Sequence, residues 1–310
     1  MVTVANDSVA PNEHVHLRGV GLVLLAGVFW STTGIIVRLI ESANEWQIVF
    51  YRSIALMLTL LVVLVVRNGR TIFSVFRAAG VNAIVGGLCL GSGFACWIFS
   101  LTHTTVANAL FLLATAPFLT AILARIVIGE RVAHATWLAM TVALLGVATM
   151  VGEGIIVGTL FGNVMGLTAA LAFSGFTVAL RRGKSVDMLP TVCLAGTFAS
   201  IIAGTVLLAT GSGFVVSGYD LSLCAALGTG QVGCGLILFT IGSRYVPAAE
   251  LALLSLTEVV LGPIWVWIGV GEVPSLWTFL GGVIVLAAVT GRALLEVRRR
   301  QKSASIRSSS

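Results

Sequence analysis

The chain has 310 residues, of which 58% are hydrophobic and only 10% are charged, and its mean hydropathy is +1.06. Soluble proteins carry about 25% charged residues, so this composition excludes a water-soluble domain and indicates a multi-pass membrane protein. The formal net charge of +6 does not indicate nucleic-acid binding, because the basic residues lie in short segments between apolar runs and in the C-terminal tail.

The apolar runs predict the number of membrane spans. A helix that crosses a bilayer needs about 20 apolar residues, and the sequence has ten such windows. It therefore predicts an all-α membrane protein with ten transmembrane helices. In chain order the windows are 18–40, 45–66, 79–100, 104–127, 133–152, 157–180, 188–210, 219–242, 245–270 and 275–295. The polar residues 1–17 and the basic residues 296–310 are expected to be tails outside the bilayer.

The Lys and Arg residues predict the orientation. With the N-terminus in the cytoplasm, every basic residue except Arg38 and Arg52 falls in a cytoplasmic segment or in the C-terminal tail. An excess of Lys and Arg is typical of cytoplasmic loops. The expectation is a protein of the cytoplasmic (inner) membrane, surrounded by lipid, with both termini in the cytoplasm.

Five polar or aromatic residues stand out in the first four spans. Trp30, within "FWSTTG", and Trp97, in the glycine-rich third span, are predicted as apolar walls of a substrate site. Asn108 and Thr115 share a face of the fourth span and would hydrogen-bond a polar ligand. Core packing and interhelical hydrogen bonding are the alternative roles for these four. Arg52, near the outer end of the second span, either pairs with an acidic group in a gate or extends its side chain to the outer surface.

The eighth and ninth spans contain the remaining predicted site residues. Gln231 lies in the middle of the eighth span, and Glu258 lies midway between Arg244 and Glu272. A charged side chain at that depth costs about 2.5–3.5 kcal/mol on insertion scales, so it should face the bundle interior, beside Ser255 on the same helical face. A carboxyl there can bind a proton or a cationic group in turn. The alternative is a buried glutamate that only stabilises helix packing.

The two halves of the chain resemble each other at a shift of 142 residues. The matches include a glycine triplet and a Gly-Glu pair: Gly86, Gly91 and Gly93 fall on Gly228, Gly233 and Gly235, and Gly129-Glu130 falls on Gly271-Glu272. Two repeats of five spans each, 18–152 and 157–295, would lie in opposite orientations, because five is an odd number. Inverted repeats are typical of secondary transporters.

Two segments carry a family resemblance. "TTVANALFLLATAPFLTAILARIVIGERV" and "AAELALLSLTEVVLGPIWVWIGVGEVP" resemble the EamA repeat of the drug/metabolite transporter superfamily, and Arg52 after "IVFY" fits the same pattern. The resemblance covers roughly residues 18–295 and implies ten helices in two inverted repeats that move small metabolites, often outward. One departure is that Val259 follows Glu258 where the family commonly has proline. Pro263 comes later, which implies a displaced helix break.

Together these features predict a secondary transporter. The expected cargo is a small polar or amphipathic metabolite, with amino acids or related amines first, exported by alternating access. No ATP-binding motif, metal-ligand spacing or nucleophile–base set is visible in the sequence, so no cofactor and no enzymatic activity are expected. Protons are the expected coupling ion. A passive facilitator or channel of the same fold stays open as an alternative, and a membrane enzyme or a sensor is a weaker one.

Overall fold

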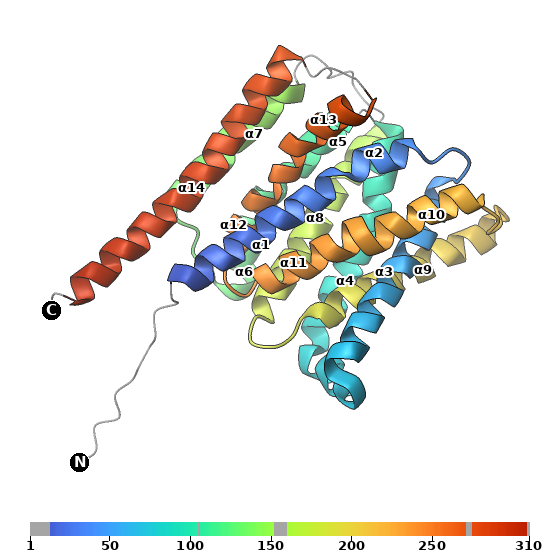
Figure 1. Ribbon diagram of the computed structural model, residues 1–310, viewed down its shortest axis with the longest axis horizontal. Coiled ribbons are helices and arrows are strands. Elements are labelled where there is room, and N and C mark those ends of the chain that lie inside the picture. The colour runs from blue at the N-terminus through green and yellow to red at the C-terminus, as the bar shows by residue number, and fades with distance from the viewer. Residues whose placement is uncertain (1–12, 105, 152–159, 271–274, 309–310) are drawn as a thin grey trace.

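The computed structural model describes residues 13–104, 106–151, 160–270 and 275–308, and every regular element in these ranges is a helix (Figure 1). The elements of the first half are α1 (Glu13–Ser31), α2 (Thr33–Arg38), α3 (Glu45–Asn68), the 3₁₀ turn η1 (Gly69–Thr71), α4 (Ile72–His103), α5 (Val106–Leu113), α6 (Ala116–Ile128) and α7 (His134–Val151). Those of the second half are α8 (Leu160–Arg182), α9 (Leu189–Thr210), α10 (Gly218–Ala226), the π-helix η2 (Leu227–Cys234), α11 (Gly235–Gly242), α12 (Ala248–Ser255), α13 (Thr257–Val270) and α14 (Leu276–Ser308).

Seven stretches of the described residues are long and apolar enough to cross a membrane. They are Val15–Val37, Glu45–His103, Ala109–Ile128, Leu160–Arg182, Leu189–Thr210, Gly218–Gly242 and Leu276–Leu295. The stretch Glu45–His103 contains both α3 and α4; Gly69, which ends α3, and Gly80, at a kink inside α4, have positive φ angles. The helices make this a multi-pass helical membrane protein.

The ends of two helices differ from the sequence windows. α1 begins at Glu13, before the expected start of the first span, and α14 continues through the basic residues to Ser308. The first window is also divided at Thr32, where α1 ends and α2 begins. The hydroxyls of Ser31, Thr32 and Thr33 each donate to the carbonyl three residues earlier, a bond that competes with the helical pattern and bends helices.

Glycines allow the central helices to approach closely. α4 packs against α8 and α9, and α3 packs against α9. A Cβ atom at Gly86 would lie 2.8 Å from the Thr191 methyl carbon, and one at Gly91 would lie 2.8 Å from the Ala195 carbonyl oxygen. Both distances are too short for a real side chain, so the glycines of α4 serve packing. α14 and α7 run side by side along one edge of the bundle (Figure 1).

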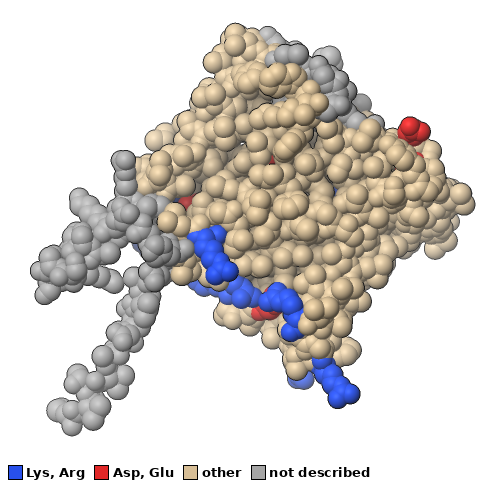
Figure 2. Space-filling view, viewed as in Figure 1, with Lys and Arg blue, Asp and Glu red and all other residues tan. Residues whose placement is uncertain are grey.

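One end of the bundle, which we call the basic side, contains the C-terminal ends of α3 and α8 and the residues that follow α11. Lys and Arg side chains gather along this edge of a face that otherwise shows few charged residues in Figure 2. Here Glu130 accepts hydrogen bonds from Arg181 Nε and from the Ala248 amide, both at 3.2 Å. Arg244 lies 3.5 Å from Asp187. These contacts fasten α6, α8, α9 and α12 together at the basic side.

The opposite end is also held by polar contacts. The Asp220 carboxylate, at the start of α10, accepts hydrogen bonds from the backbone amides of Glu41, Ser42 and Ala43 and from the Ser42 hydroxyl. The Tyr51 hydroxyl donates to the Phe214 carbonyl oxygen. The segment between α2 and α3 is thereby attached to the segment that leads into α10.

Two helix breaks occur at corresponding places in the two halves. α5 gives way to α6 at Thr115, and α12 gives way to α13 at Leu256, just before Thr257. The hydroxyls of Thr115 and Thr257, which are 142 residues apart, donate to the carbonyls of Leu112 and Leu254 at 2.6 and 2.7 Å. The same local hydrogen bond therefore accompanies the break in each half.

Candidate functional site

Glu258 is the polar residue that the α12–α13 break brings into the bundle. It is the second residue of α13, and its side chain is half-buried. Within the described part of the chain, no group donates a hydrogen bond to its carboxylate or forms an ion pair with it. A carboxyl that is partly accessible and unpaired at this depth is available to a proton or to a ligand.

The direction of Glu258 follows from its neighbours on α13. Trp267, nine residues later, is 42% exposed and lies on the opposite face of the helix, because nine residues make two and a half turns. Trp265, seven residues later, shares the face of Glu258, and its indole nitrogen donates to the Ser31 hydroxyl oxygen at 2.7 Å. A Cβ on Gly27 of α1 would lie 3.5 Å from the Glu258 amide nitrogen. Glu258 therefore faces α1 and not the lipid.

The structure brings Trp30 and Gln231 together. The Gln231 side-chain nitrogen donates to the Trp30 carbonyl oxygen at 3.1 Å and to the Thr33 hydroxyl. The Gln231 side-chain oxygen is buried and has no partner. The amide nitrogen therefore attaches η2 to α1, while the side-chain oxygen has no partner among the described residues.

The π-helix η2 explains how Gln231 reaches this position. Single π-turns inside α-helices are rare and are frequent at functional sites. Here η2 contains Gly228, Gly230 and Gly233, which lower the steric cost of the wider turn. Gly235, which follows η2, has no room for a side chain because the Trp30 indole packs against its backbone. Trp30 also contacts Phe173 of α8 edge-on, with the ring centroids 5.9 Å apart.

Arg52 lies inside the bundle and does not extend to the outer surface. It is 3% exposed, and its guanidinium carbon lies 4.7 Å from the centre of the Phe94 ring. Its Nε and Nη2 atoms are buried without hydrogen-bond partners. The side chain therefore takes the interior position of the two that the sequence allows, but no described acidic residue pairs with it.

The other predicted site residues are Ser255, Thr115, Trp97 and Asn108. Ser255 is buried and donates its hydroxyl to the Ala252 carbonyl of its own helix, as Thr115 does to Leu112. Trp97 is half-buried on α4, without a described ring contact or hydrogen bond to Trp30 or Gln231. The side chain of Asn108 lies outside the described part of the structure, although its backbone belongs to α5.

A buried charged cluster was missed by the sequence reasoning. Glu250 of α12 is 1% exposed and lies 3.7 Å from His16 Nε2 and 3.8 Å from Arg292 Nη2. Arg292 also donates to the Thr136 hydroxyl at 2.7 Å, so the cluster joins α1, α7, α12 and α14. The sequence signal for this cluster was Glu250 itself, an acidic residue about two helical turns before Glu258 in the same span.

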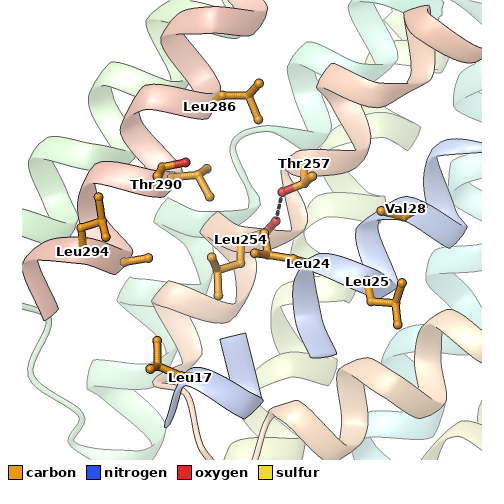
Figure 3. Close-up of a pocket in the computed structure, with 11 residues that line it drawn as sticks. Leu17, Leu24, Leu25, Val28, Leu254, Thr257, Leu286, Thr290 and Leu294 are labelled. Atoms are coloured by element: carbon orange, nitrogen blue, oxygen red, sulfur yellow. Dashed lines mark hydrogen bonds between the residues drawn. The ribbon is translucent and has the colours of Figure 1, made fainter. Parts of the chain in front are cut away.

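A groove of about 460 Å³ lies between α1, α12 and α14 (Figure 3). Its lining is apolar apart from Thr257 and Thr290, and none of the predicted site residues lines it. Leu17 and Leu294, which border it, are 42% and 54% exposed. The groove is thus part of the apolar outer surface and is separate from the contacts of Trp30 and Gln231.

The broken helices, the buried polar side chains and the unpaired interior carboxyl define a membrane protein of the transporter class. Comparison with known proteins agrees. The model of the EamA-like transporter family matches residues 17–152 and again residues 160–292, and the chain belongs to this family.

Individual relatives are more distant. The chain is 25% identical over 272 residues to the pseudopaline exporter CntI of Pseudomonas aeruginosa (strain UCBPP-PA14), which covers 86% of this chain and 93% of the relative. It is 29% identical over 199 residues to an uncharacterized transporter of Archaeoglobus fulgidus, covering 63% and 70%. A solved crystal structure superposes with a TM-score of 0.75 at 18% identity over 92% of this chain and 99% of the other, which shows a shared fold.

Proposed function

We propose that this protein is a secondary transporter that exports a small polar or amphipathic metabolite across the cytoplasmic membrane. Amino acids and related amines are the proposed cargo. The observation that carries this proposal is Glu258, an interior carboxyl that is partly accessible and has no described protein partner. Gln231, with a buried and unpartnered side-chain oxygen, supplies a polar contact next to Trp30.

The proposed architecture is ten spans in two inverted repeats, 18–152 and 157–295, between cytoplasmic tails. The matching breaks at Thr115 and Thr257 support two equivalent halves, as does the double match of the family model. Inverted halves have two arrangements of similar energy that open to opposite sides. The proposed orientation places the basic side in the cytoplasm, in line with the excess of Lys and Arg there.

The proposed energy source is a proton gradient. A carboxyl in the interior that releases its proton to bind cargo, and rebinds it afterwards, couples the two movements in opposite directions. Glu258 is the group proposed for this role. Asn108, Thr115, Ser255 and Trp97 are proposed to contribute to the walls of the same site at some stage of the cycle.

Counterflow of a labelled panel tests this function directly. The full-length protein is placed in liposomes loaded with unlabelled amino acid or amine, and the uptake of the labelled compound is followed with and without an imposed pH gradient. We expect counterflow of at least one compound and its accumulation when the gradient is imposed. Counterflow without any effect of the gradient identifies a passive facilitator instead, and absence of counterflow across the panel contradicts the proposed cargo class.

A further inference from the structure

We propose that Arg52 binds a carboxylate group of the transported molecule, so that the cargo carries both an anionic and a cationic group. This inference rests on the proposed function, because it concerns the same substrate. It selects amino acids and other zwitterions over simple amines.

The first argument is that Arg52 is buried without a counter-ion. The residue is 3% exposed, and its Nε and Nη2 atoms make no hydrogen bond to any residue that the structure describes. The guanidinium group is charged at every physiological pH and loses its hydration on burial, so an unpaired one is strongly destabilising. A ligand anion in the working cycle removes this cost.

The second argument is the contrast with the other arginines that are at least partly buried in the described helices and loops. Arg181 pairs with Glu130 at 3.2 Å, Arg244 with Asp187 at 3.5 Å and Arg292 with Glu250 at 3.8 Å. Each of these has a carboxylate of the protein itself. Arg52 is placed like them but lacks one, which is the pattern of a side chain whose partner arrives from outside.

The third argument is the way in which Arg52 is held. The backbone of α3 at Arg52 packs directly against Gly228 of η2, where a Cβ would collide with the Arg52 carbonyl oxygen and lie 2.7 Å from the Ala55 Cβ. The guanidinium group lies over the Phe94 ring, a contact that orients the cation without neutralising it. Its planar edge is thus pre-arranged for a carboxylate, which guanidinium groups bind with two parallel hydrogen bonds.

Unpartnered acceptors lie on η2, which packs against α3, and on α13, which packs against α1. Gln231 Oε1, three residues after Gly228 in η2, is a buried acceptor without a donor, and the Glu258 carboxylate has no described partner. An ammonium group satisfies such acceptors, and a carboxylate satisfies Arg52. A zwitterion offers both groups in one molecule, whereas a simple amine leaves Arg52 unpaired.

The test compares each amino acid with the amine that remains when its carboxylate is removed. Histidine with histamine, and phenylalanine with phenethylamine, are measured by counterflow in liposomes for the wild type, Arg52→Gln and Arg52→Lys. We expect the wild type to show a KM at least tenfold lower for each amino acid than for its amine. In Arg52→Gln the KM of the amino acid should rise to that of the amine, and the KM of the amine should not change. Arg52→Lys should recover part of the preference, because it keeps the charge but loses the two-pronged geometry.

The outcomes separate this inference from the function on which it rests. Arg70→Gln removes an exposed arginine of η1 and is the matched control, with kinetics expected to equal those of the wild type. Size-exclusion profiles show whether Arg52→Gln folds. If it does not fold, the test is the ratio of the KM for the amine to the KM for the amino acid in Arg52→Lys. A ratio equal to that of the wild type then overturns the proposal. Equal KM values for the two members of a pair in the wild type, or an unchanged ratio in Arg52→Gln, also overturn it while transport stands. Wild-type protein that moves neither member of any pair contradicts the proposed cargo class and the role of Arg52 with it.

Discussion

Glu258 owes its availability to the residues around it. Gly27 leaves the neighbouring turn of α1 without a side chain, and Trp265, two turns along the same face of α13, donates its hydrogen bond to Ser31, so nothing described neutralises the carboxyl. Glu250, on the same span, is instead surrounded by His16 and Arg292. Two glutamates eight residues apart thus have different surroundings: Glu250 joins helices, whereas Glu258 has no described partner and is the proposed site for ligands and protons.

The Trp265–Ser31 hydrogen bond gives a prediction at this scale. Trp265→Phe keeps an aromatic ring but removes the donor at 2.7 Å from Ser31 Oγ, which should cost about 0.5–1.5 kcal/mol. We expect the thermal unfolding midpoint in detergent to fall by a few degrees and counterflow to slow. Trp267→Phe, on the exposed face of the same helix, is the control and should leave both unchanged. Equal effects of the two substitutions would show that the hydrogen bond does not position α13.

Single residues also show where sequence reasoning reaches its limit. Hydropathy and the position of polar residues in apolar runs single out Glu258, Trp30 and Gln231, but the hydrogen bond from Gln231 to the Trp30 carbonyl does not follow from them. The burial of Arg52 does not follow from them either, because a long side chain near a helix end reaches either the surface or the interior, and only the packing of Phe94 and Gly228 decides between them. Similarly, the hydroxyls of Ser31, Thr32 and Thr33 bond to their own backbone, a choice that composition does not reveal.

At the scale of elements, η2 holds α3 and α1 at once. Its Gly228 faces the backbone of Arg52, and its Gln231 hydrogen-bonds to Trp30 and Thr33. Glycine-rich segments permit close helix packing, as the contacts of Gly86 and Gly91 with α9 also show. The π-helical turn was not predictable, because its widening depends on neighbouring helices and not on a local motif.

The two glycines at the start of η2 provide a matched pair for testing this element. Gly228→Ala places a methyl group against α3 and should destabilise by about 1–3 kcal/mol, the usual cost of overpacking. Gly230→Ala has nothing within 4 Å and should be neutral or slightly stabilising, since alanine favours helix over glycine. Thermal unfolding in detergent measures both. Equal midpoints for the two variants would contradict the close contact between η2 and α3.

The position of the helix break in the ninth span also differs from the position that the sequence suggested. The sequence suggested that the break is displaced toward Pro263, whereas α12 ends at Ser255 and α13 starts at Thr257. Hydroxyls of Ser255 and Thr257 bond to carbonyls three residues earlier, which tightens the turn without any proline. Local hydrogen bonds of this kind are weak signals in a sequence, because Ser and Thr make them throughout ordinary helices.

For the whole molecule, we propose that the contacts of the basic side hold that side closed. Glu130, Arg181 and the Ala248 amide fasten three helices there, so weakening them should favour a conformation open to that side. We predict that Glu130→Gln, in a background that retains Cys234 as its one cysteine, increases labelling of Cys234 by a membrane-impermeant maleimide added on the basic side. An increase on the order of tenfold corresponds to a shift of about 1.4 kcal/mol in the equilibrium between conformations.

A control variant distinguishes this effect from a general loosening of the protein. Arg67 pairs with Asp187 at 3.7 Å but is 50% exposed, and exposed ion pairs contribute about 0–1 kcal/mol. Arg67→Gln should therefore leave the labelling rate close to that of the parent. Similar rates for Glu130→Gln and Arg67→Gln would mean that Glu130 does not hold the basic side closed.

The central claim is that one interior carboxyl links cargo movement to proton movement. It is tested most directly in liposomes that contain a trapped pH-sensitive dye and are presented with the best-transported amino acid of the panel. Wild-type protein should produce a proton flux opposite to the cargo. Glu258→Gln should retain cargo counterflow without any proton flux, and Glu258→Asp should restore part of it. A proton flux in Glu258→Gln equal to that of the wild type would contradict the account.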